Sequence, residues 1–222
     1  LVDGGVDFIK EDEIMSNPIF CPLDKRVELV SNYLAKQSRK IVYCHTINCD
    51  PHILVDRVKR VVELGGVGVH INVYSGLGSY NSIRKLDLPL FIHFQKSGDR
   101  VFTCRENRYS IAWPVICQLA TLMGVDTIQT GMIGGYSNDD PKEIKECLKI
   151  LHDGNTLPAL SCGMHPGLVD SVTDLIGVDY LANVGGAIHS HNGGTLAGTR
   201  AMRQAIDKDY GNEYETAIQQ FS

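Results

Sequence analysis

The sequence lacks several features that would assign it to a common class. It has no apolar run near the ~18 residues that a membrane-spanning helix needs, and no signal-peptide pattern at its start. It also lacks a basic stripe: 21 Lys and Arg face 26 Asp and Glu, a formal net charge of −5. Because duplex-binding proteins depend on basic surfaces, we do not expect nucleic acid as a partner. Because no apolar run is long enough to span a bilayer, we do not expect a membrane as a partner either.

Paired cysteine motifs are missing as well. The seven cysteines are odd in number, scattered and never spaced C-x-x-C. This pattern argues against a disulfide framework or a structural zinc site and favours a reducing, cytoplasmic location. The G-x-S-x-G nucleophile signature and the P-loop are also absent.

The length of 222 residues suits one large α/β domain, and no linker, low-complexity tract or repeat suggests an internal boundary. We therefore predict a single domain over residues 1–222. The chain opens with Leu1 rather than Met, and strand-like residues follow almost at once. We interpret this opening as a sign that the sequence is a fragment.

Short apolar runs with the length and composition of buried strands alternate with segments of helical period. The predicted strands are Val6–Ile9, Ile41–Cys44, Val67–Tyr74, Leu88–Ile92, Asp126–Gln129, Leu157–Leu160 and Leu181–Val184. The clearest predicted helices are Asp24–Lys40, Pro51–Leu64 and Asp140–Leu151.

Seven β-α repeats without a strand-only stretch predict a parallel sheet. Alternation alone also allows an open doubly wound sheet. Seven units favour a (β/α)8 TIM barrel that lacks its first βα unit, and this is the fold class that we predict.

Polar and glycine residues concentrate directly after the predicted strands, where a barrel gathers its chemistry. Lys10 to Glu13 follow the first strand, and Ser75 to Gly78 follow the third. The fourth strand is followed by His93 to Lys96, and the sixth by Ser161 to Gly163. We expect the functional site at these strand ends.

The segment Lys10-Glu11-Asp12-Glu13 places three carboxylates and a lysine on one short turn. Mg²⁺ takes oxygen ligands and commonly uses one or two carboxylates with water and substrate. The alternative is a solvated helix start, where acidic residues are favoured by the helix dipole.

Two glycine loops resemble anion sites. Ser161-Cys162-Gly163 follows the sixth strand and Gly185-Gly186 the seventh, and the loops after the last two strands of many barrels bind phosphate. A tight left-handed turn is the alternative role for such glycines. Lys96 can add a cation for another part of a substrate, or it is a plain surface lysine.

Among the eight histidines, His93 at a predicted strand end is the best candidate for function. The pair His189-x-His191 has metal-like spacing but no third ligand at a recognisable spacing nearby. A structural role is the alternative for each histidine.

The opening segment Gly4-Gly5-Val6-Asp7-Phe8-Ile9-Lys10-Glu11-Asp12-Glu13 resembles G-G-x-D-x-x-K-x-D-E of the large chain of ribulose-bisphosphate carboxylase (RuBisCO) and RuBisCO-like proteins. The resemblance continues in the family's order through Ile92-His93, Gly131-Met132-Ile133-Gly134-Gly135, Ser161-x-Gly163-x-His165 and Gly185-Gly186. It covers nearly the whole chain.

This resemblance implies roles for particular residues. In the family the lysine is carbamylated by CO₂, and the carbamate binds Mg²⁺ together with the aspartate and the glutamate. Carried over, the metal ligands are Lys10, Asp12 and Glu13, with Lys10 also catalytic. The resemblance further implies that His93 touches the reacting end of the substrate. The implied substrate and phosphate contacts are Lys96, Ser161, Gly163, Gly185 and Gly186.

The sequence departs from the family where carboxylation is performed. The family's sixth loop places a lysine directly after a glycine, and here Tyr136 follows Gly135. A phenol supplies no fixed cation to a developing carboxylate. The histidine that the family has before this loop is Gln129 here.

The family's H-x-H-R motif fits the fourth strand in two registers. If His93 is the first histidine, Gln95 replaces the second and Lys96 the arginine, which keeps the charge without the bidentate fork. If His93 is the second, Phe91 and Phe94 replace the other two, and Lys96 loses its assigned role.

The family also has substrate-binding lysines on a first barrel strand, and the amino-terminal domain of a partner subunit completes its sites. The resemblance thus implies a homodimer, and an amino-terminal domain and first βα unit that this sequence lacks.

Together, these features predict a RuBisCO-like, Mg²⁺-dependent enolase or isomerase. Its substrate would be a small phosphorylated ketose or diketose, such as the methylthio-sugar phosphates of sulfur salvage, from which a proton is abstracted next to a carbonyl. Three alternatives stay open: a true carboxylase, a metal-independent isomerase, and an inactive truncated or split chain that needs a complementary piece.

Overall fold

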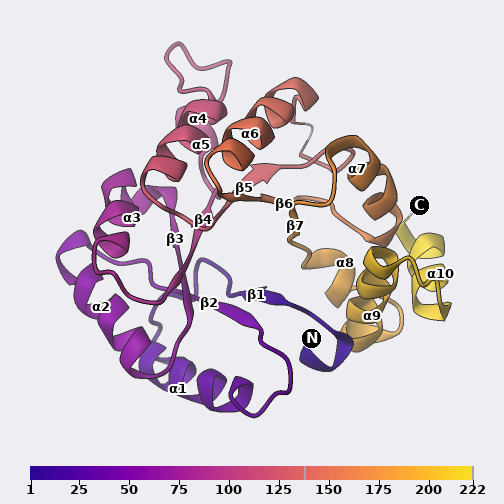
Figure 1. The fold of residues 1–222 in the computed structure, drawn as a ribbon, viewed down its shortest axis with the longest axis horizontal. Coiled ribbons are helices and arrows are strands. Elements are labelled where there is room, and N and C mark those ends of the chain that lie inside the picture. Colours follow the sequence, from indigo (N-terminus) through magenta and orange to yellow (C-terminus); the bar gives the residue numbers. More distant parts are fainter. Residues whose placement is uncertain (138, 222) are drawn as a thin grey trace. The chain divides into compact units, whose positions relative to one another are not determined.

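The computed structural model describes residues 1–137 and 139–221, in which strands and helices alternate along the chain (Figure 1). The strands are β1 (Phe8–Lys10), β2 (Val42–Thr46), β3 (Gly68–Asn72), β4 (Phe91–Gln95), β5 (Thr127–Gly131), β6 (Leu157–Leu160) and β7 (Leu181–Ala182).

The helices between them are α1 (Leu23–Leu34), α2 (Pro51–Glu63), α3 (Leu77–Arg84), α4 (Arg100–Thr103), α5 (Trp113–Leu122), α6 (Pro141–Asp153), α7 (Val169–Ile176), α8 (Gly186–His189), α9 (Gly194–Asp207) and α10 (Asn212–Phe221). Three 3₁₀ turns complete the set: η1 (Val2–Gly4), η2 (Val73–Ser75) and η3 (Pro166–Leu168).

The strand order confirms the predicted fold class. The strands pair in the order β1-β2-β3-β4-β5-β6-β7, and the described registers, such as Lys10 beside Cys44 and His70 beside His93, are parallel. A doubly wound sheet reverses its strand order at a switch point, and no reversal occurs among the described strands. The chain therefore has a singly wound α/β fold of the TIM-barrel type.

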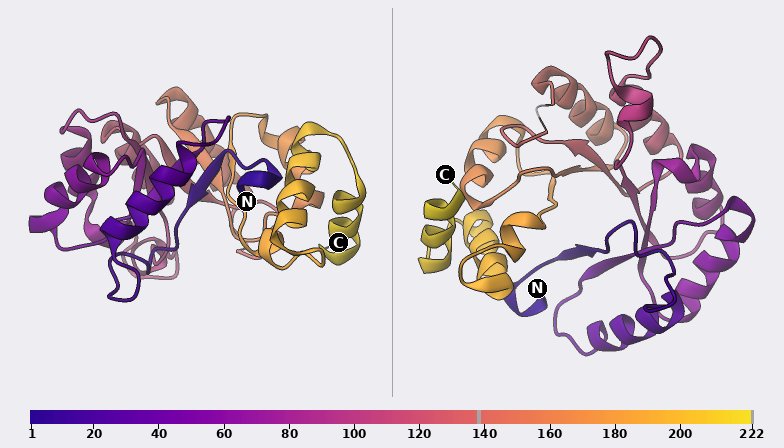
Figure 2. Two further views of the ribbon diagram at one scale, coloured as in Figure 1. Left: turned by 90° about the horizontal axis from the view of Figure 1, so that it is seen from below. Right: turned by 180° about the vertical axis from the view of Figure 1, so that it is seen from behind.

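The chain divides into two compact units. One consists of residues 7–128 and 150–156, and the other of residues 1–6, 129–149 and 157–222. In the first, α1, α2 and α3 cover one side of β1 to β4 (Figure 2). Phe94 of β4 stacks on Tyr80 of α3 with ring centroids 4.2 Å apart, and both are fully buried. Because side chains alternate along a strand, His93 and Gln95 face the opposite side of β4.

The second unit has its own core. Met132, Leu160, Met164, Val169, Val172, Ile188, Met202 and Ala205 form a buried hydrophobic cluster. In the same unit α10 lies beside α9 (Figure 2). Gly198 permits the close approach of α9 to α8, because a Cβ there would lie 2.2 Å from the carbonyl oxygen of Ile188.

The predicted bounds of the fourth strand and of the first helix were wrong. The predicted fourth strand, Leu88–Ile92, lies three residues too early, since β4 spans Phe91–Gln95. Pro89 has no N–H to donate to a neighbouring strand, which explains why pairing starts after it. His93 is therefore inside the strand rather than after it. The predicted helix Asp24–Lys40 ends earlier, at Leu34.

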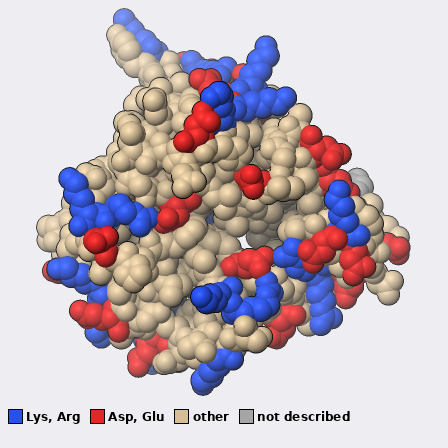
Figure 3. Space-filling model, viewed as in Figure 1, with Lys and Arg blue, Asp and Glu red and all other residues tan. Residues whose placement is uncertain are grey.

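None of the helices in the described part of the chain is both long enough and apolar enough to cross a membrane. On the face shown in Figure 3, residues of both charge signs occur around the surface.

Candidate active site

The carboxyl end of β1 brings two of the predicted metal ligands together. Lys10 Nζ lies 3.6 Å from Glu13 Oε2, and both side chains are partly buried. Burial raises the pKa of Glu13, but the Ser97 hydroxyl and the Lys10 ammonium outweigh it, so the pKa is lowered overall. Asp12 is exposed, and its Oδ1 accepts a hydrogen bond from the Ile14 N–H at 3.0 Å.

Glu11, the third carboxylate of the turn, contacts Arg26, His45 and Thr46. It is buried, and it accepts hydrogen bonds from Arg26 Nε at 2.6 Å and the Thr46 N–H at 2.9 Å, with His45 Nδ1 3.0 Å away. Burial raises the pKa of Glu11, but His45 and Arg26 outweigh this effect and lower it. Glu11 is thus a structural carboxylate and not an open ligand.

Arg26 ties the whole turn to the start of α1. Besides Glu11, its guanidinium donates to the carbonyl oxygens of Met15 at 2.6 Å, Ser16 at 3.1 Å and Cys21 at 2.7 Å. One buried cation therefore holds both ends of the loop that carries Asp12 and Glu13.

Hydrogen bonds join the ends of β1 to β4 in a closed ring. Asn48 Nδ2 donates to the Glu13 carbonyl at 2.8 Å, and Asn48 Oδ1 accepts from the Asn72 N–H at 2.8 Å. Asn72 Nδ2 donates to the Ser97 carbonyl at 2.8 Å. Gln95 Nε2 donates to Ser97 Oγ at 2.7 Å and to Glu13 Oε2 at 3.2 Å, which closes the ring. This arrangement orients Glu13 through both its backbone and its carboxylate.

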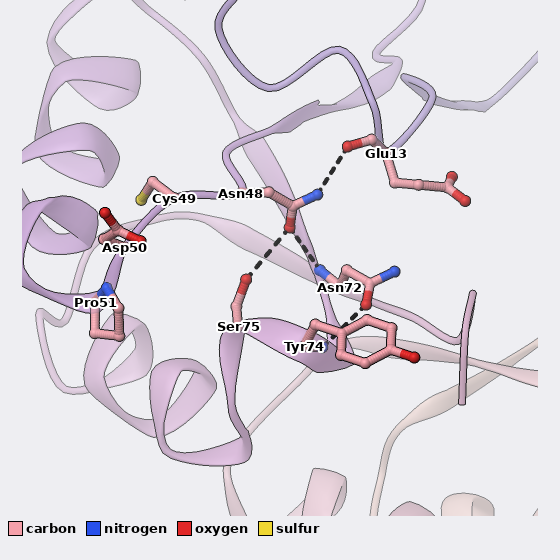
Figure 4. A pocket seen from close by; sticks show the side chains of 8 residues that line it. All are labelled: Glu13, Asn48, Cys49, Asp50, Pro51, Asn72, Tyr74 and Ser75. Carbon is pink, nitrogen blue, oxygen red and sulfur yellow. Dashed lines mark hydrogen bonds between the residues drawn. The ribbon is translucent and has the colours of Figure 1, made fainter. Parts of the chain in front are cut away.

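A pocket of about 380 Å³ opens beside this ring (Figure 4). It is lined by Glu13, Asn48, Asn72, Tyr74 and Ser75, together with the segment Cys49-Asp50-Pro51 at the start of α2. Asn48 lies in the middle, and dashed bonds connect it to Glu13, Asn72 and Ser75 in Figure 4. The pocket thus lies at the carboxyl ends of the first strands, where the sequence predicts the site.

The turn that carries Asp12 and Glu13 could hold a hard cation such as Mg²⁺ only if further oxygen atoms were added beside these carboxylates. Among the described residues, no group of three or more His, Cys, Asp or Glu side chains is placed to hold a metal ion. Asp12 and Glu13 offer the oxygen donors that Mg²⁺ prefers. A carbamate on Lys10 would add further oxygens beside Glu13, and binding of Mg²⁺ by Lys10, Asp12 and Glu13 stays a prediction.

His93 is fully buried on the inner side of β4, next to His70 of β3. The two rings form an edge-to-face pair with centroids 6.1 Å apart, and Phe8 packs on His93 at 5.6 Å. Among the described residues, no group is hydrogen-bonded to the ring nitrogens of either histidine. The predicted contact of His93 with substrate stays a prediction.

Both histidines are held neutral. Burial, with the charge of Lys10 as the next cause, lowers the pKa of His70 to about 3. Burial, then His70 and Lys10, lower the pKa of His93 well below its usual range. A histidine that is neutral when folded and basic when unfolded takes up a proton on unfolding. Stability therefore falls as the pH drops below the unfolded pKa of ~6.5.

We predict that H70L reduces this acid sensitivity. When the pH is lowered from 7 to 5, the free energy of unfolding of the wild type should fall by about 2 kcal/mol more than that of H70L, because only the wild type has His70 to protonate on unfolding. Urea unfolding of wild type and H70L at both pH values measures the difference, and any constant packing cost cancels. H52L, at an exposed position on α2, is the control and should keep the wild-type loss. An equal loss in wild type and H70L would contradict the assignment.

Lys96 follows β4 but turns towards α5. Its Nζ lies 4.0 Å from Asp99 Oδ2 and 4.6 Å from the centre of the Trp113 ring. The ion pair and the cation–π contact hold the side chain there. Its predicted role in binding substrate stays a prediction.

In the second unit, two backbone hydrogen bonds join the segments that follow β5 and β6. The Ser161 N–H donates to the Gly131 carbonyl at 3.2 Å, and the Tyr136 N–H donates to the Cys162 carbonyl at 3.1 Å. Gly135 makes this contact possible, since a Cβ there would lie 2.2 Å from the Cys162 oxygen. Tyr136 itself is 82% exposed.

The two predicted phosphate loops follow neighbouring strands, as expected. β6 pairs with β7 through Leu160 and Ala182, and Gly185-Gly186 stands at the beginning of α8. Both glycines are exposed, and apart from their neighbours in the chain and the backbone of α8, no described residue has an atom within 4 Å of a Cβ built on either of them. Anion binding by these loops stays a prediction.

His189 and His191 have structural partners. His191 is buried, with Nε2 3.0 Å from the Glu213 carbonyl oxygen and Nδ1 accepting from the Gly193 N–H at 2.9 Å. His189 Nδ1 lies 3.1 Å from Thr195 Oγ1. These contacts favour the structural role for the pair.

No sequence motif assigns a role to Asn48, Asn72 or Ser75, and Gln95 stands out only as a substitution in the family's motif. Their signal was their place at the ends of β2, β3 and β4 or directly after them, the region already predicted to carry the site. Amide and hydroxyl side chains are common at strand ends, so the sequence does not single out these four residues. Their contacts in the structure do.

Comparisons with known proteins identify the family of this fold. The model of the family "ribulose bisphosphate carboxylase large chain, catalytic domain" matches residues 1–153. The 2,3-diketo-5-methylthiopentyl-1-phosphate enolase of Exiguobacterium sibiricum is 31% identical over 227 residues, which cover 96% of this chain and 57% of that protein. The ribulose bisphosphate carboxylase of Archaeoglobus fulgidus is 28% identical over 235 residues, covering 93% and 53%.

The crystal structure of a rubisco-like protein from Alicyclobacillus acidocaldarius has a TM-score of 0.90 at 26% identity, covering 100% of this chain and 61% of that one. The chain thus spans little more than half the length of these relatives. Carboxylases and enolases match at similar identity, so the matches establish the family but not the reaction. With most of its length matched by the family model, the chain belongs to the family of the RuBisCO large chain.

Proposed function

We propose that the chain is the catalytic barrel of a RuBisCO-like enolase or isomerase, acting in the cytoplasm on a small phosphorylated ketose or diketose. The reaction would begin with removal of a proton next to a carbonyl group. One observation carries this proposal: the Lys10 amine lies 3.6 Å from the Glu13 carboxylate, which the ring through Asn48 and Gln95 orients.

Carbamylated Lys10, Asp12 and Glu13 would hold Mg²⁺. When bound, Mg²⁺ would polarise the substrate carbonyl and stabilise the charge that develops on its oxygen. Gln95 would keep the Glu13 carboxylate in place, and a carbamate oxygen on Lys10 is a candidate to accept the proton. Arg26 would keep the loop closed by holding Glu11 and the backbone around it.

Tyr136 favours enolisation over carboxylation. It follows Gly135 in the loop after β5, where the resemblance places a lysine that stabilises the carboxylated intermediate. Electrostatic interaction with Cys162, followed by burial, raises the pKa of Tyr136, so the phenol is neutral near pH 7. A neutral side chain offers no fixed positive charge to a newly formed carboxylate.

The remaining predicted contacts complete the proposal. Gly163, Gly185 and Gly186 would bind the phosphate through backbone N–H groups and Ser161 through its hydroxyl, since the Ser161 N–H donates to the Gly131 carbonyl. The E. sibiricum relative is named for a substrate with one phosphate and a methylthio end, which supports a substrate of this class. A homodimer is the proposed assembly.

The test uses the full chain with Mg²⁺ and bicarbonate. We expect 2,3-diketo-5-methylthiopentyl 1-phosphate to be enolised, followed as ultraviolet absorbance and as deuterium uptake from D₂O, with loss of the signal on chelation. Ribulose bisphosphate with labelled CO₂ should give no labelled acid. Labelled acid would instead support the carboxylase, and turnover that ignores the chelator would support a metal-independent isomerase.

A further inference from the structure

Helix α10 holds the segment that joins α8 to α9. Gln220, near the end of α10, bonds to this segment twice: its Nε2 donates to the Ser190 carbonyl at 2.7 Å, and its Oε1 accepts from the Asn192 N–H at 2.9 Å. His191 lies between these two residues and is buried, with its Nε2 3.0 Å from the Glu213 carbonyl of α10. Three consecutive residues of the segment are therefore bonded to one helix.

The same bonds reach the Gly185-Gly186 loop through α8, which spans only Gly186–His189. At the end of α8, the Ser190 N–H donates to the Gly186 carbonyl at 2.9 Å, and Ser190 Oγ donates to the same carbonyl at 2.7 Å. Ser190 thus bonds to Gly186 on one side and, through its own carbonyl, to Gln220 on the other. Because this chain of hydrogen bonds is short, a movement of Gly186 would disturb the bond between Ser190 and Gln220.

Helix α10 also contacts the segment that follows Gly163. A Cβ built on Gly167 would lie 2.9 Å from Ile218 Cδ1 of α10, so the two residues are in close contact. The Phe221 ring lies beside the His165 ring, with centroids 5.9 Å apart, and His165 Nδ1 accepts from the Gly167 N–H at 3.2 Å. His165 is two residues after Gly163, so α10 supports the end of this loop as well.

The glycines of the two loops do not fix their own orientation, because a glycine backbone is conformationally permissive. Gly185 and Gly186 are also exposed. Backbone N–H groups bind an anion tightly when they already point to one place before it arrives, since ordering them on binding costs free energy. The orientation must therefore come from the segments that flank the loops, and α10 contacts both of these segments.

Building on the proposed function, we propose that α10 positions the two phosphate-binding loops, and that Gln220 is a positioning residue for Gly186. Gln220 acts through Ser190 and not on the substrate. Ile218 and Phe221 act on the other loop through residues 165–167. The helix thereby sets the affinity for the phosphate group, whereas the chemistry at Lys10 does not depend on it.

Gln220→Met tests this proposal, because methionine keeps the length of the side chain and removes both of its hydrogen bonds. Gln219→Met makes the same change at the exposed neighbouring position of α10 and is the matched control. By calorimetry on the full chain with Mg²⁺ and bicarbonate, we expect pentyl phosphate to bind about fivefold more weakly to Q220M, the loss typical of one or two hydrogen bonds, and unchanged to Q219M.

Turnover separates positioning from a merely structural role. In Q220M the KM for the diketone phosphate should rise about fivefold while kcat stays within about twofold of wild type, because only phosphate binding is weakened. The ¹³C carbamate resonance of Lys10 should be unchanged. A structural role alone would lower the unfolding temperature and leave the affinity of the folded protein as it is, so wild-type affinity in Q220M overturns the proposal.

Hydrogen exchange distinguishes failure of this proposal from failure of the proposed function. Backbone amides of residues 185–190 should exchange faster in Q220M than in Q219M, and those of residues 163–167 faster in I218A. If exchange rises but pentyl phosphate binds to none of the proteins, the proposed phosphate contacts fail, and only the link from α10 to the loops is supported. If wild type and Q220M bind pentyl phosphate equally, the phosphate contacts stand and the role of α10 is wrong.

Discussion

Lys10→Arg is expected to reduce Mg²⁺-dependent turnover by at least about 10³-fold, because it removes the group that would carry the carbamate. Arginine keeps a positive charge beside Glu13, so this variant separates loss of the carbamate from loss of charge. Turnover of the diketone phosphate with saturating Mg²⁺ and bicarbonate measures the effect. Turnover at the wild-type rate in K10R would refute the role of Lys10.

A readout other than activity accompanies this prediction. Incubation with ¹³C-labelled bicarbonate and Mg²⁺ should give a carbamate resonance in wild type and none in K10R. K40R, which makes the same substitution at an exposed lysine, should keep both the resonance and the turnover. Thermal unfolding of all three proteins shows whether the fold is retained.

Arg26→Met is expected to lower the free energy of unfolding by about 3–5 kcal/mol, because it leaves the Glu11 carboxylate buried without its cation. The side chains of Arg26 and Glu11 are only 9% and 4% exposed, so water cannot replace the lost partner well. Urea unfolding at pH 7 measures the change. The loop carrying Asp12 and Glu13 should also become more open to proteolysis, since it loses three backbone anchors.

Arg39→Met is the matched control. Arg39 pairs with Asp7 on the surface, with side chains 47% and 62% exposed, and such pairs contribute at most about 1 kcal/mol. The double variant R26M/E11Q should recover part of the loss, because it no longer buries an unpaired charge. If R26M were no less stable than R39M, the buried pair would not hold the loop as described.

The order of elements, and the strand ends at which the candidate residues stand, could be predicted from the sequence. Short apolar runs alternate with segments of helical period, and the carboxyl ends of parallel strands lie at one edge of a sheet. The sequence alone therefore predicts Lys10, Glu13 and the loop at Ser161 at strand ends. The error at β4 shows the limit of this approach. A run from Leu88 to Phe94 is apolar throughout except for His93, and only pairing with β3 decides that the strand runs to Gln95.

The sequence by itself determined the α/β repeat, the acidic turn and the glycine loops, because periodicity and composition are local properties. Tertiary structure decided which members of the turn face each other. Glu11 turns to Arg26 and His45, while Glu13 meets Gln95, a residue 82 positions away in the chain. It also decided that His93 is buried and that Asn48 and Asn72 belong to a closed ring. Such contacts depend on strand pairing and on how buried polar groups find partners, and no local pattern of residues contains that information.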